Sequence, residues 1–172
     1  RHDGDRLRLA RPALIDIGAA GKGFLVDLIA RELRGAGIDV FVIDGSGDLL
    51  ISSPEPVRIG LEDPRAPGRV IGTVALTGAA VCASSTRRRS WGDGLHHVLD
   101  AYPGLPVQDV LATWTVSTAC AEADGLATAL FTTSPNELAR AGFRYDFALL
   151  RTDGSAAASR GFADLPGELF IA

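Results

Sequence analysis

A series of short apolar runs, each ended by turn-forming residues, is the feature that most constrains how this chain can fold. Four such runs follow one another in the first half of the sequence, at 38–43, 48–52, 57–61 and 70–76. Apolar or alternating runs of this length, bounded by glycine, proline and aspartate, are typical of β-strands. We therefore expect four strands here, each paired with its neighbour along the chain.

The remaining elements add a few helices to this strand series. After a glycine-rich segment at 16–23, apolar residues recur at helical spacing, and Gly35 and Gly37 supply a stop signal. The apolar face of this helix is predicted to contain Phe24, Leu25, Leu28, Ile29 and Leu33. A strand, two helices and a closing strand are then predicted over 113–118, 121–132, 136–141 and 145–151. Such an order favours an α+β fold, with helices packed on a mainly antiparallel mixed sheet.

The size and charge of the chain disfavour several classes of protein. With 172 residues, 47% of them apolar, the chain is predicted to form a single domain over 1–172. A net charge of −4, with no basic run longer than 87–89, argues against nucleic acid as a partner. No apolar stretch approaches the roughly 20 residues that span a bilayer. Cys82 and Cys120 form one disulfide at most, so they do not reveal the redox compartment.

Lys22 is the only lysine among 17 basic residues, and it lies in the glycine-rich segment at the expected start of a helix. Backbone N–H groups at a helix start, the positive end of the helix dipole and an ammonium group together suit an anion. Because Gly23 stands where a Walker loop needs a hydroxyl, a nucleotide triphosphatase is disfavoured. The segment 44–48 lacks the third glycine of a dinucleotide fingerprint. The alternative is that both segments are tight turns whose glycines need positive φ.

Asp124 and Thr128 are four residues apart in the predicted helix 121–132, so their side chains share one face. A carboxylate and a hydroxyl are hard oxygen donors, which suit Mg²⁺ better than zinc or copper. The alternative is structural. Asp124 would then favour the start of the helix, and Thr128 would bond back to a helix carbonyl.

Two of the three histidines, His96 and His97, are adjacent in the sequence beside a predicted turn. Neighbouring residues of an extended segment face opposite sides, so only one of the two can point into a given site, and a zinc pair is disfavoured. The spacing also fits no serine-hydrolase or zinc-protease template. The alternative is a pair of partly exposed histidines beside a turn.

Six stretches, taken in this order, resemble the ApbE family of FAD:protein FMN transferases, and they extend over nearly the whole chain. They are DIGAAGKGFLVD at 16–27, VIDGSGD at 42–48, RIGLEDP at 58–64, AVCAS at 80–84, HVLDAYPGLP at 97–106 and ADGLATALF at 123–131. The resemblance implies an α+β fold related to the T-fold, FAD bound as the substrate, and bound Mg²⁺. It also implies transfer of FMN from FAD to a threonine or serine of a target flavoprotein, with release of AMP.

The resemblance further implies roles for individual residues. FAD would be contacted by Asp16, Lys22, Ser84 and Leu99. Mg²⁺ would be held by the carbonyl of Ala19 and the side chains of Asp124 and Thr128. His97 occupies the position of the catalytic histidine, where it takes the proton of the acceptor hydroxyl or positions that hydroxyl for attack.

Two other functions stay open beside the transferase. One is a hydrolase that splits FAD into FMN and AMP, and the other is a non-catalytic module that binds flavin or a protein partner. Members of the family carry an N-terminal half before the first motif, so we expect a partner chain or a further segment to supply that half. Family members are often exported lipoproteins, which implies a periplasmic or cell-surface location, although a cytoplasmic one stays open.

Overall fold

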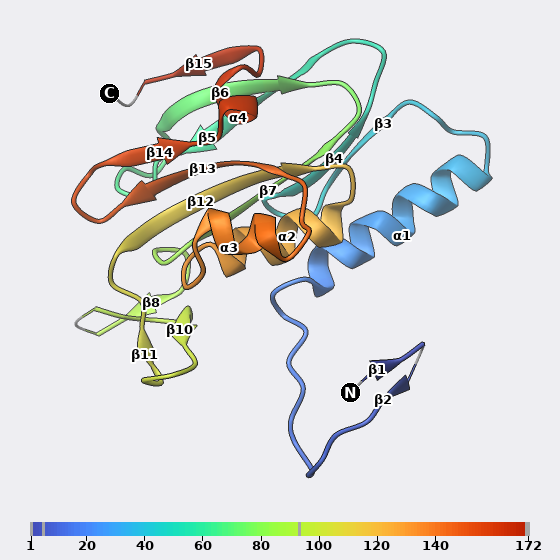
Figure 1. Cartoon of the computed structure of the whole chain (residues 1–172). Helices are drawn as coiled ribbons and strands as arrows, with labels where there is room; N and C mark the ends of the chain where they lie inside the picture. Colours follow the sequence, from blue (N-terminus) through green and yellow to red (C-terminus); the bar gives the residue numbers. More distant parts are fainter. Residues whose placement is uncertain (1, 5, 93, 171–172) are drawn as a thin grey trace.

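The computed structural model describes residues 2–4, 6–92 and 94–170, and its largest element is a six-stranded sheet (Figure 1). In spatial order its strands are β14 (Ala156–Ala158), β13 (Asp146–Arg151), β12 (Val110–Ser117), β7 (Ala80–Ser85), β4 (Asp48–Ser52) and β3 (Phe41–Asp44). Each neighbouring pair is antiparallel. The predicted α+β fold with a mainly antiparallel sheet is confirmed.

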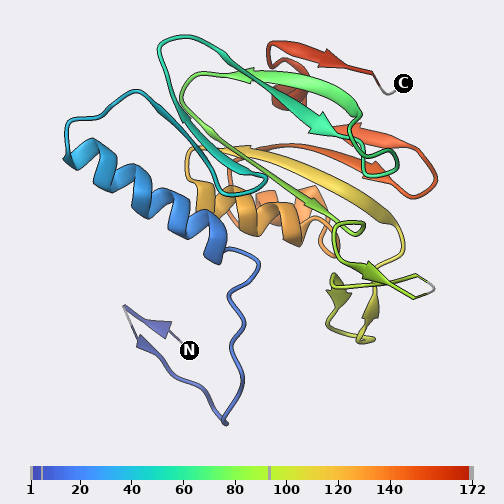
Figure 2. The same cartoon turned by 180° about the vertical axis from the view of Figure 1, so that it is seen from behind.

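Different layers cover the two faces of this sheet. A three-stranded sheet covers one face, in the order β15 (Gly167–Leu169), β6 (Val70–Leu76) and β5 (Val57–Glu62). The other face carries the helices α1 (Gly21–Gly35) and α2 (Cys120–Ala129), as both views show (Figures 1 and 2). Two shorter helices follow α2 in the chain, α3 (Pro135–Arg140) and α4 (Arg160–Ala163).

Three two-stranded hairpins complete the fold of the residues that the structure describes. They are β1 (His2–Asp3) with β2 (Arg6–Leu7), β8 (Ser90–Trp91) with β9 (Leu95–His96), and β10 (Leu99–Asp100) with β11 (Leu105–Pro106). The hairpin of β1 and β2 lies apart from both sheets at the end of an extended arm (Figure 2). Within the described part of the chain, no helix has the length and apolar character needed to cross a membrane.

The predicted pairing of the first four strands is correct in two places and wrong in one. β3 pairs with β4 and β5 with β6, but β4 and β5 belong to different sheets. β4 is buried along much of its length and takes β7 as its second partner. The segment of β7 was not predicted as a strand, because its alanine, cysteine and serine side chains give a weak strand signal.

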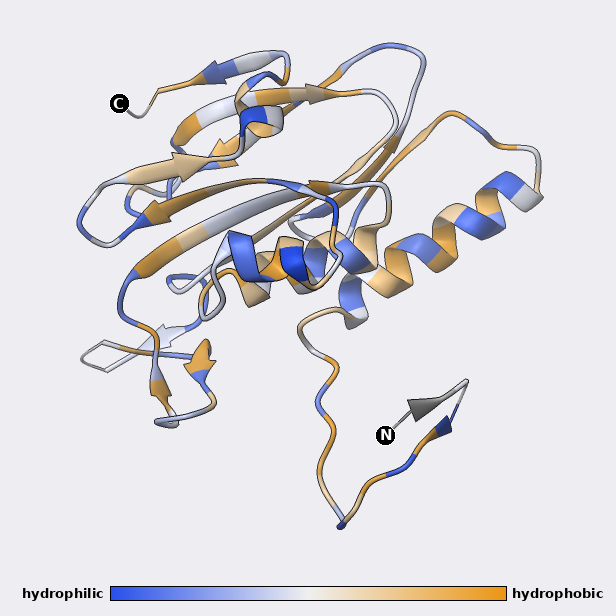
Figure 3. Ribbon diagram, viewed as in Figure 1, coloured by the Kyte–Doolittle hydropathy of each residue, from blue (hydrophilic) through white to orange (hydrophobic). Residues whose placement is uncertain are grey.

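Helix α1 forms where it was predicted and ends in a Schellman motif. Gly37 has a φ of 78°, and the N–H of Ile38 donates to the carbonyl of Leu33. The predicted apolar face is correct only in part, because Leu28 and Leu33 are half-buried and the other three residues are exposed. The buried residues are Gly23, Val26 and Ala30, whereas Phe24, Leu25 and Ile29 are 55%, 56% and 41% exposed. Small residues face inward because α1 packs closely against α2 and the sheet. The ribbon of α1 carries both hydrophobic and hydrophilic residues along its length (Figure 3).

Candidate functional site

The glycine-rich segment owes its glycines to close packing. The tight-turn alternative is correct in that this segment forms a turn, but Gly18, Gly21 and Gly23 all lack the positive φ that it required. The N–H groups of Ala20 and Gly21 donate to the carbonyl of Ile17, which closes the turn before α1. A Cβ atom at Gly23 would lie only 2.8 Å from the Cβ of Asp124. Glycine at position 23 therefore lets the start of α1 touch α2.

The second glycine segment is a true turn between β3 and β4. Ser46 and Gly47 have φ values of 65° and 100°. The Asp44 carboxylate accepts hydrogen bonds from both of their N–H groups, at 2.8 and 3.1 Å. The tight-turn alternative holds here, and the turn places Asp48 at the first position of β4.

The carboxylate of Asp124 lies at the start of α1. Its Oδ2 accepts a hydrogen bond of 2.9 Å from the N–H of Gly23, one of the N–H groups that a helix start leaves unpaired. Burial raises the pKa of Asp124 to about 6; Asp48 also raises this pKa, while the Gly23 N–H and Lys22 lower it. The anionic form is therefore costly unless further positive charge is present.

Asp48 is a site residue that the sequence analysis missed. Its side chain is fully buried, and its Oδ2 forms an ion pair with the ammonium of Lys22. Its Oδ1 is buried and has no hydrogen-bond partner within the described part of the chain. The signal was present in the sequence, because Asp48 ends the second glycine segment. The role of Asp48 could not be predicted, however, because it depends on the contact with Lys22, which lies 26 positions away in the sequence.

The two helices close each other's N-terminal ends. Asp124 of α2 accepts from Gly23 of α1, and Asp27 of α1 accepts from the N–H groups of Cys120 and Ala121, each at 2.9 Å. Neither helix has a capping side chain at its own N-cap residue. Each start is thus stabilised by a carboxylate from the other helix. This reciprocal arrangement fixes Lys22 relative to Asp124.

Thr128 lies one turn beyond Asp124 on α2, and its hydroxyl is 3.5 Å from the hydroxyl of Ser84 on β7. The turn that carries Ala19 passes over the same helix, because Ala20 Cβ is 3.7 Å from the Cβ position that a side chain at Gly125 would take. Thr128 thus lies one turn beyond Asp124, next to Ser84, and the turn of Ala19 lies beside α2 near Gly125. Asp16 lies in the same turn, where its Oδ1 accepts from the N–H of Gly18 at 2.7 Å.

The adjacent histidines have different surroundings. His96 is buried, with Nε2 2.9 Å from the carbonyl of Val107, and its Nδ1 accepts from the N–H of Val98. His97 is exposed, and its Nδ1 is 3.4 Å from the carbonyl of Arg89. Only one of the two is thus available to a ligand, as predicted. The alternative of two exposed histidines is wrong for His96.

The histidine segment is attached at the far end of α2. Val98 packs with Val110 and with Phe131, which follows α2 in the chain. Leu99, on β10, is 55% exposed. Among the described residues, no hydrogen bond or ion pair joins His97 to Lys22 or Asp124. The structure therefore presents two groups of candidate residues, one at the start of α1 and one beyond the end of α2.

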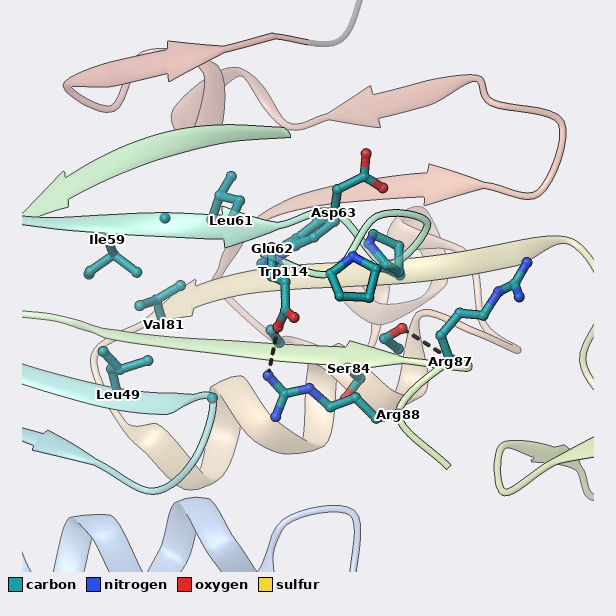
Figure 4. Close-up of a pocket in the computed structure, with 17 residues that line it drawn as sticks. Leu49, Ile59, Leu61, Glu62, Asp63, Val81, Ser84, Arg87, Arg88 and Trp114 are labelled. Atoms are coloured by element: carbon teal, nitrogen blue, oxygen red, sulfur yellow. Dashed lines mark hydrogen bonds and ion pairs between the residues drawn. The ribbon is translucent and has the colours of Figure 1, made fainter. Parts of the chain in front are cut away.

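A cavity of about 290 Å³ lies between the two sheets, on the side of the large sheet away from α1 (Figure 4). Its walls are mainly apolar and include Leu49, Ile59, Val81 and Trp114. Its rim is charged, and there Arg88 forms an ion pair with Glu62 at 3.0 Å. Ser84 also lines this cavity, so it borders both the cavity and the Thr128 hydroxyl.

The donor set near α2 fits a hard divalent cation. No cluster of three or more His, Cys, Asp or Glu side chains suited to a metal occurs in the described residues. A cation here would depend on the Asp124 carboxylate, the Thr128 hydroxyl and a backbone carbonyl, with the remaining positions filled by water and phosphate oxygens. Mg²⁺ binds in this way at phosphates. Two buried carboxylates beside one ammonium also leave an excess negative charge that a divalent ion would balance.

Cys82 and Cys120 are both buried and free, with their sulfur atoms 3.5 Å apart. The neighbouring Cys120 thiol and burial raise the pKa of Cys82, so its thiol stays protonated. These two residues belong to the packing between β7 and α2.

Comparisons with known proteins identify the relatives of this chain. The model of the ApbE family matches residues 2–144. The FAD:protein FMN transferase of Vibrio cholerae serotype O1 is 29% identical over 138 residues, covering 74% of this chain and 41% of that protein. The FAD:protein FMN transferase of Rhodobacter capsulatus is 31% identical over 135 residues, covering 74% of this chain and 26% of that protein.

A solved structure shares the fold described above. The ApbE protein from Thermotoga maritima superposes with a TM-score of 0.78 at 26% identity, covering 87% of this chain and 52% of that chain. The present chain thus spans about half, or less, of the length of these relatives. Because the family model matches most of the 172 residues, the chain belongs to the ApbE family.

Proposed function

We propose that this chain forms one domain that supplies the flavin- and magnesium-binding part of an FAD:protein FMN transferase. The observation that carries this proposal is that the Lys22 ammonium and the Asp124 carboxylate, which accepts from the N–H of Gly23, both lie at the start of α1. A diphosphate and a divalent cation together match these charges. The relatives named as FAD:protein FMN transferases support FAD as the source of that diphosphate.

Each residue then has a defined part in binding. Lys22 and the start of α1 face the diphosphate of FAD, while Asp16, Ser84 and Leu99 contact other parts of the molecule. Ala19, through its carbonyl, and the side chains of Asp124 and Thr128 hold Mg²⁺. When bound, Mg²⁺ would neutralise negative charge on the diphosphate as the reaction proceeds.

His97 is the proposed catalytic residue. An acceptor threonine or serine gives its proton to His97, its oxygen bonds to the phosphorus of the FMN moiety, and the bond from that phosphorus to the AMP oxygen breaks. His97 is open to solvent, which suits an acceptor that is itself a protein. The products are a target flavoprotein with FMN attached through a phosphoester, and AMP.

The exposed apolar side of α1 supports a further part of the proposal. Phe24, Leu25 and Ile29 are all at least 41% exposed, although large apolar side chains gain by burial. We assign this side to contact with the part of the relatives that this chain does not match, either in the same protein or in a partner chain.

The test uses the whole protein that carries this chain, with FAD, Mg²⁺ and an acceptor flavoprotein. Mass spectrometry should show FMN added to the acceptor and an equal amount of AMP. Asp124→Ala should abolish turnover at all Mg²⁺ concentrations, whereas Glu122→Gln, a change on the same helix, should retain it. His97→Ala should lose transfer but still bind FAD.

Other outcomes would change the assignment. Formation of FMN and AMP without modified acceptor would make the protein an FAD hydrolase. Failure to bind FAD with Mg²⁺ present would make it a non-catalytic module. Full turnover by Asp124→Ala would remove Asp124 from the metal site.

A further inference from the structure

We propose that Asp48 is a positioning residue, which holds the ammonium of Lys22 at the start of α1 so that it is ready to receive the diphosphate. This inference rests on the proposed function, because it assigns a new residue to the same site. Asp48 is not one of the proposed Mg²⁺ ligands, although it lies close to Asp124, and the inference concerns a contact with Lys22 that exists before any ligand binds.

The first argument is the geometry of the ion pair. Asp48 is fully buried, whereas the side chain of Lys22 is 43% exposed. Asp48 thus has a fixed position inside the fold, and Lys22 extends from it toward solvent. An ammonium has three N–H donors, so a bond to Asp48 leaves two for a ligand.

The second argument is the path of the lysine stem. Cγ of Lys22 lies 3.6 Å from the position that a Cβ atom would take at Gly45. The turn between β3 and β4 therefore contacts Lys22 twice, because Gly45 lies against the stem and Asp48 accepts from the ammonium, while the missing side chain at Gly45 leaves room for Val26, whose Cγ2 would lie 2.9 Å from a Cβ there. The carbonyl of Asp48 closes the same turn by accepting from the N–H of Gly45 at 2.8 Å.

The third argument is the energetic benefit of holding a lysine. Its long side chain loses conformational freedom when a ligand fixes it, and this loss weakens binding. Because Asp48 already restrains the ammonium in the folded protein, less conformational entropy is lost when the ligand binds. Since Oδ1 of Asp48 has no hydrogen-bond partner among the described residues, the ion pair with Lys22 is the interaction that holds this buried carboxylate.

A double-mutant cycle on FAD binding tests the coupling between the two residues. Quenching of flavin fluorescence would give the dissociation constant of FAD, with Mg²⁺ saturating, for the wild type, Lys22→Met, Asp48→Asn and the double variant. We expect Asp48→Asn to weaken binding about tenfold and Lys22→Met at least as much. The double variant should be no weaker than Lys22→Met alone, because Asp48 acts through Lys22.

The outcomes separate the alternatives. Effects that multiply in the double variant would overturn the proposal, since Asp48 would then act independently of Lys22. Asp44→Asn is the matched control on the same turn, because an asparagine oxygen can still accept the two N–H groups; it should change FAD affinity less than twofold. If the wild type binds no FAD, the proposed function fails. The next measurement still tests whether Lys22 and Asp48 form the ion pair.

That measurement uses the single lysine of this chain. In a ¹⁵N-labelled sample of the 172-residue chain without FAD, one side-chain ammonium signal belongs to Lys22 without further assignment. We expect a signal that is protected from rapid exchange with water. A signal averaged by fast exchange, like that of a solvated lysine, would overturn the proposal even if Asp48→Asn fails to fold.

Discussion

The two faces of the six-stranded sheet are built from different kinds of residue. Toward β5, β6 and β15, the buried cluster contains large apolar side chains such as Ile51, Trp114 and Leu150. Toward α1 and α2, the buried cluster consists mostly of alanine and cysteine with a few larger residues. Among the described residues, the buried polar side chains on this helix-bearing side are Asp48, Thr113, Thr115, Ser117 and Asp124.

We infer from this difference that one face of the sheet serves mainly stability and the other mainly ligand binding. Large apolar residues supply most of the free energy of folding, since that energy grows with the apolar area buried. Small residues let helix and strand backbones approach closely, and buried polar groups between them then have fixed positions. On β12 the two kinds alternate, with Thr113 and Thr115 bonded to α2 carbonyls and Trp114 pointing away. Substitutions on the two faces should therefore affect different measurements.

The largest effect should come from Trp114→Ala on the apolar face. Trp114 is 3% exposed, so the change leaves a large void, and we expect the free energy of unfolding to fall by about 3–5 kcal/mol. FAD affinity of the molecules that remain folded should be unchanged. Urea denaturation followed by circular dichroism measures the loss, and Trp91→Ala, at a 56% exposed position, is the control. A large drop in FAD affinity would contradict the separation of the two faces.

A smaller effect on stability is expected for Asp27→Asn, which removes one of two carboxylate oxygens from the start of α2. The asparagine amide cannot accept from both Cys120 and Ala121, so the free energy of unfolding should fall by about 1–2 kcal/mol. Here Mg²⁺ affinity should also weaken, because Asp27 fixes α2 relative to α1. Thermal unfolding with and without Mg²⁺ measures both effects. If the stabilisation by Mg²⁺ is unchanged, Asp27 only caps the helix.

The smallest effect is expected for Thr115→Val, which removes the hydroxyl that donates to the carbonyl of Ala123 at 2.6 Å. The volume is retained and that carbonyl keeps its bond within the helix, so the loss should be about 1 kcal/mol. Thr115→Val thus tests whether the polar bonds under α2 matter less for stability than Trp114 on the same strand. A loss as large as that of Trp114→Ala would overturn the comparison.

The sequence predicted the elements of the fold better than their partners. Strands such as β4 and β6 were predicted with the correct bounds, because alternation and turn residues are local signals. The partner of β4 and the buried face of α1 were not, since both depend on small residues whose role is set by the neighbouring layer. The large apolar residues of α1 did not indicate the side that packs against α2 and the sheet. That side carries Gly23 and Ala30, because no large side chain fits there.

The candidate site shows the same limit. Lys22 and Asp124 were singled out from residue type and spacing together with the family resemblance, and both lie at the start of α1, where the charge of Lys22 acts on Asp124. Asp48 and Asp27 were not predicted as site residues, although both lie in stretches that resemble the family. Their importance comes from contacts 26 and 93 residues away in the sequence, which no local pattern reveals.

The reciprocal closing of α1 and α2 has a consequence for their motions. An opening that frees the first turn of α1 exposes Asp124, and one that frees the first turn of α2 exposes Asp27, so neither end should fray alone. In deuterated water, we expect the amides of Gly23, Cys120 and Ala121 to lose their protons at matched rates, as one cooperative unit. A ligand that slows exchange at the first of these amides should slow it at the other two, although they belong to a different helix.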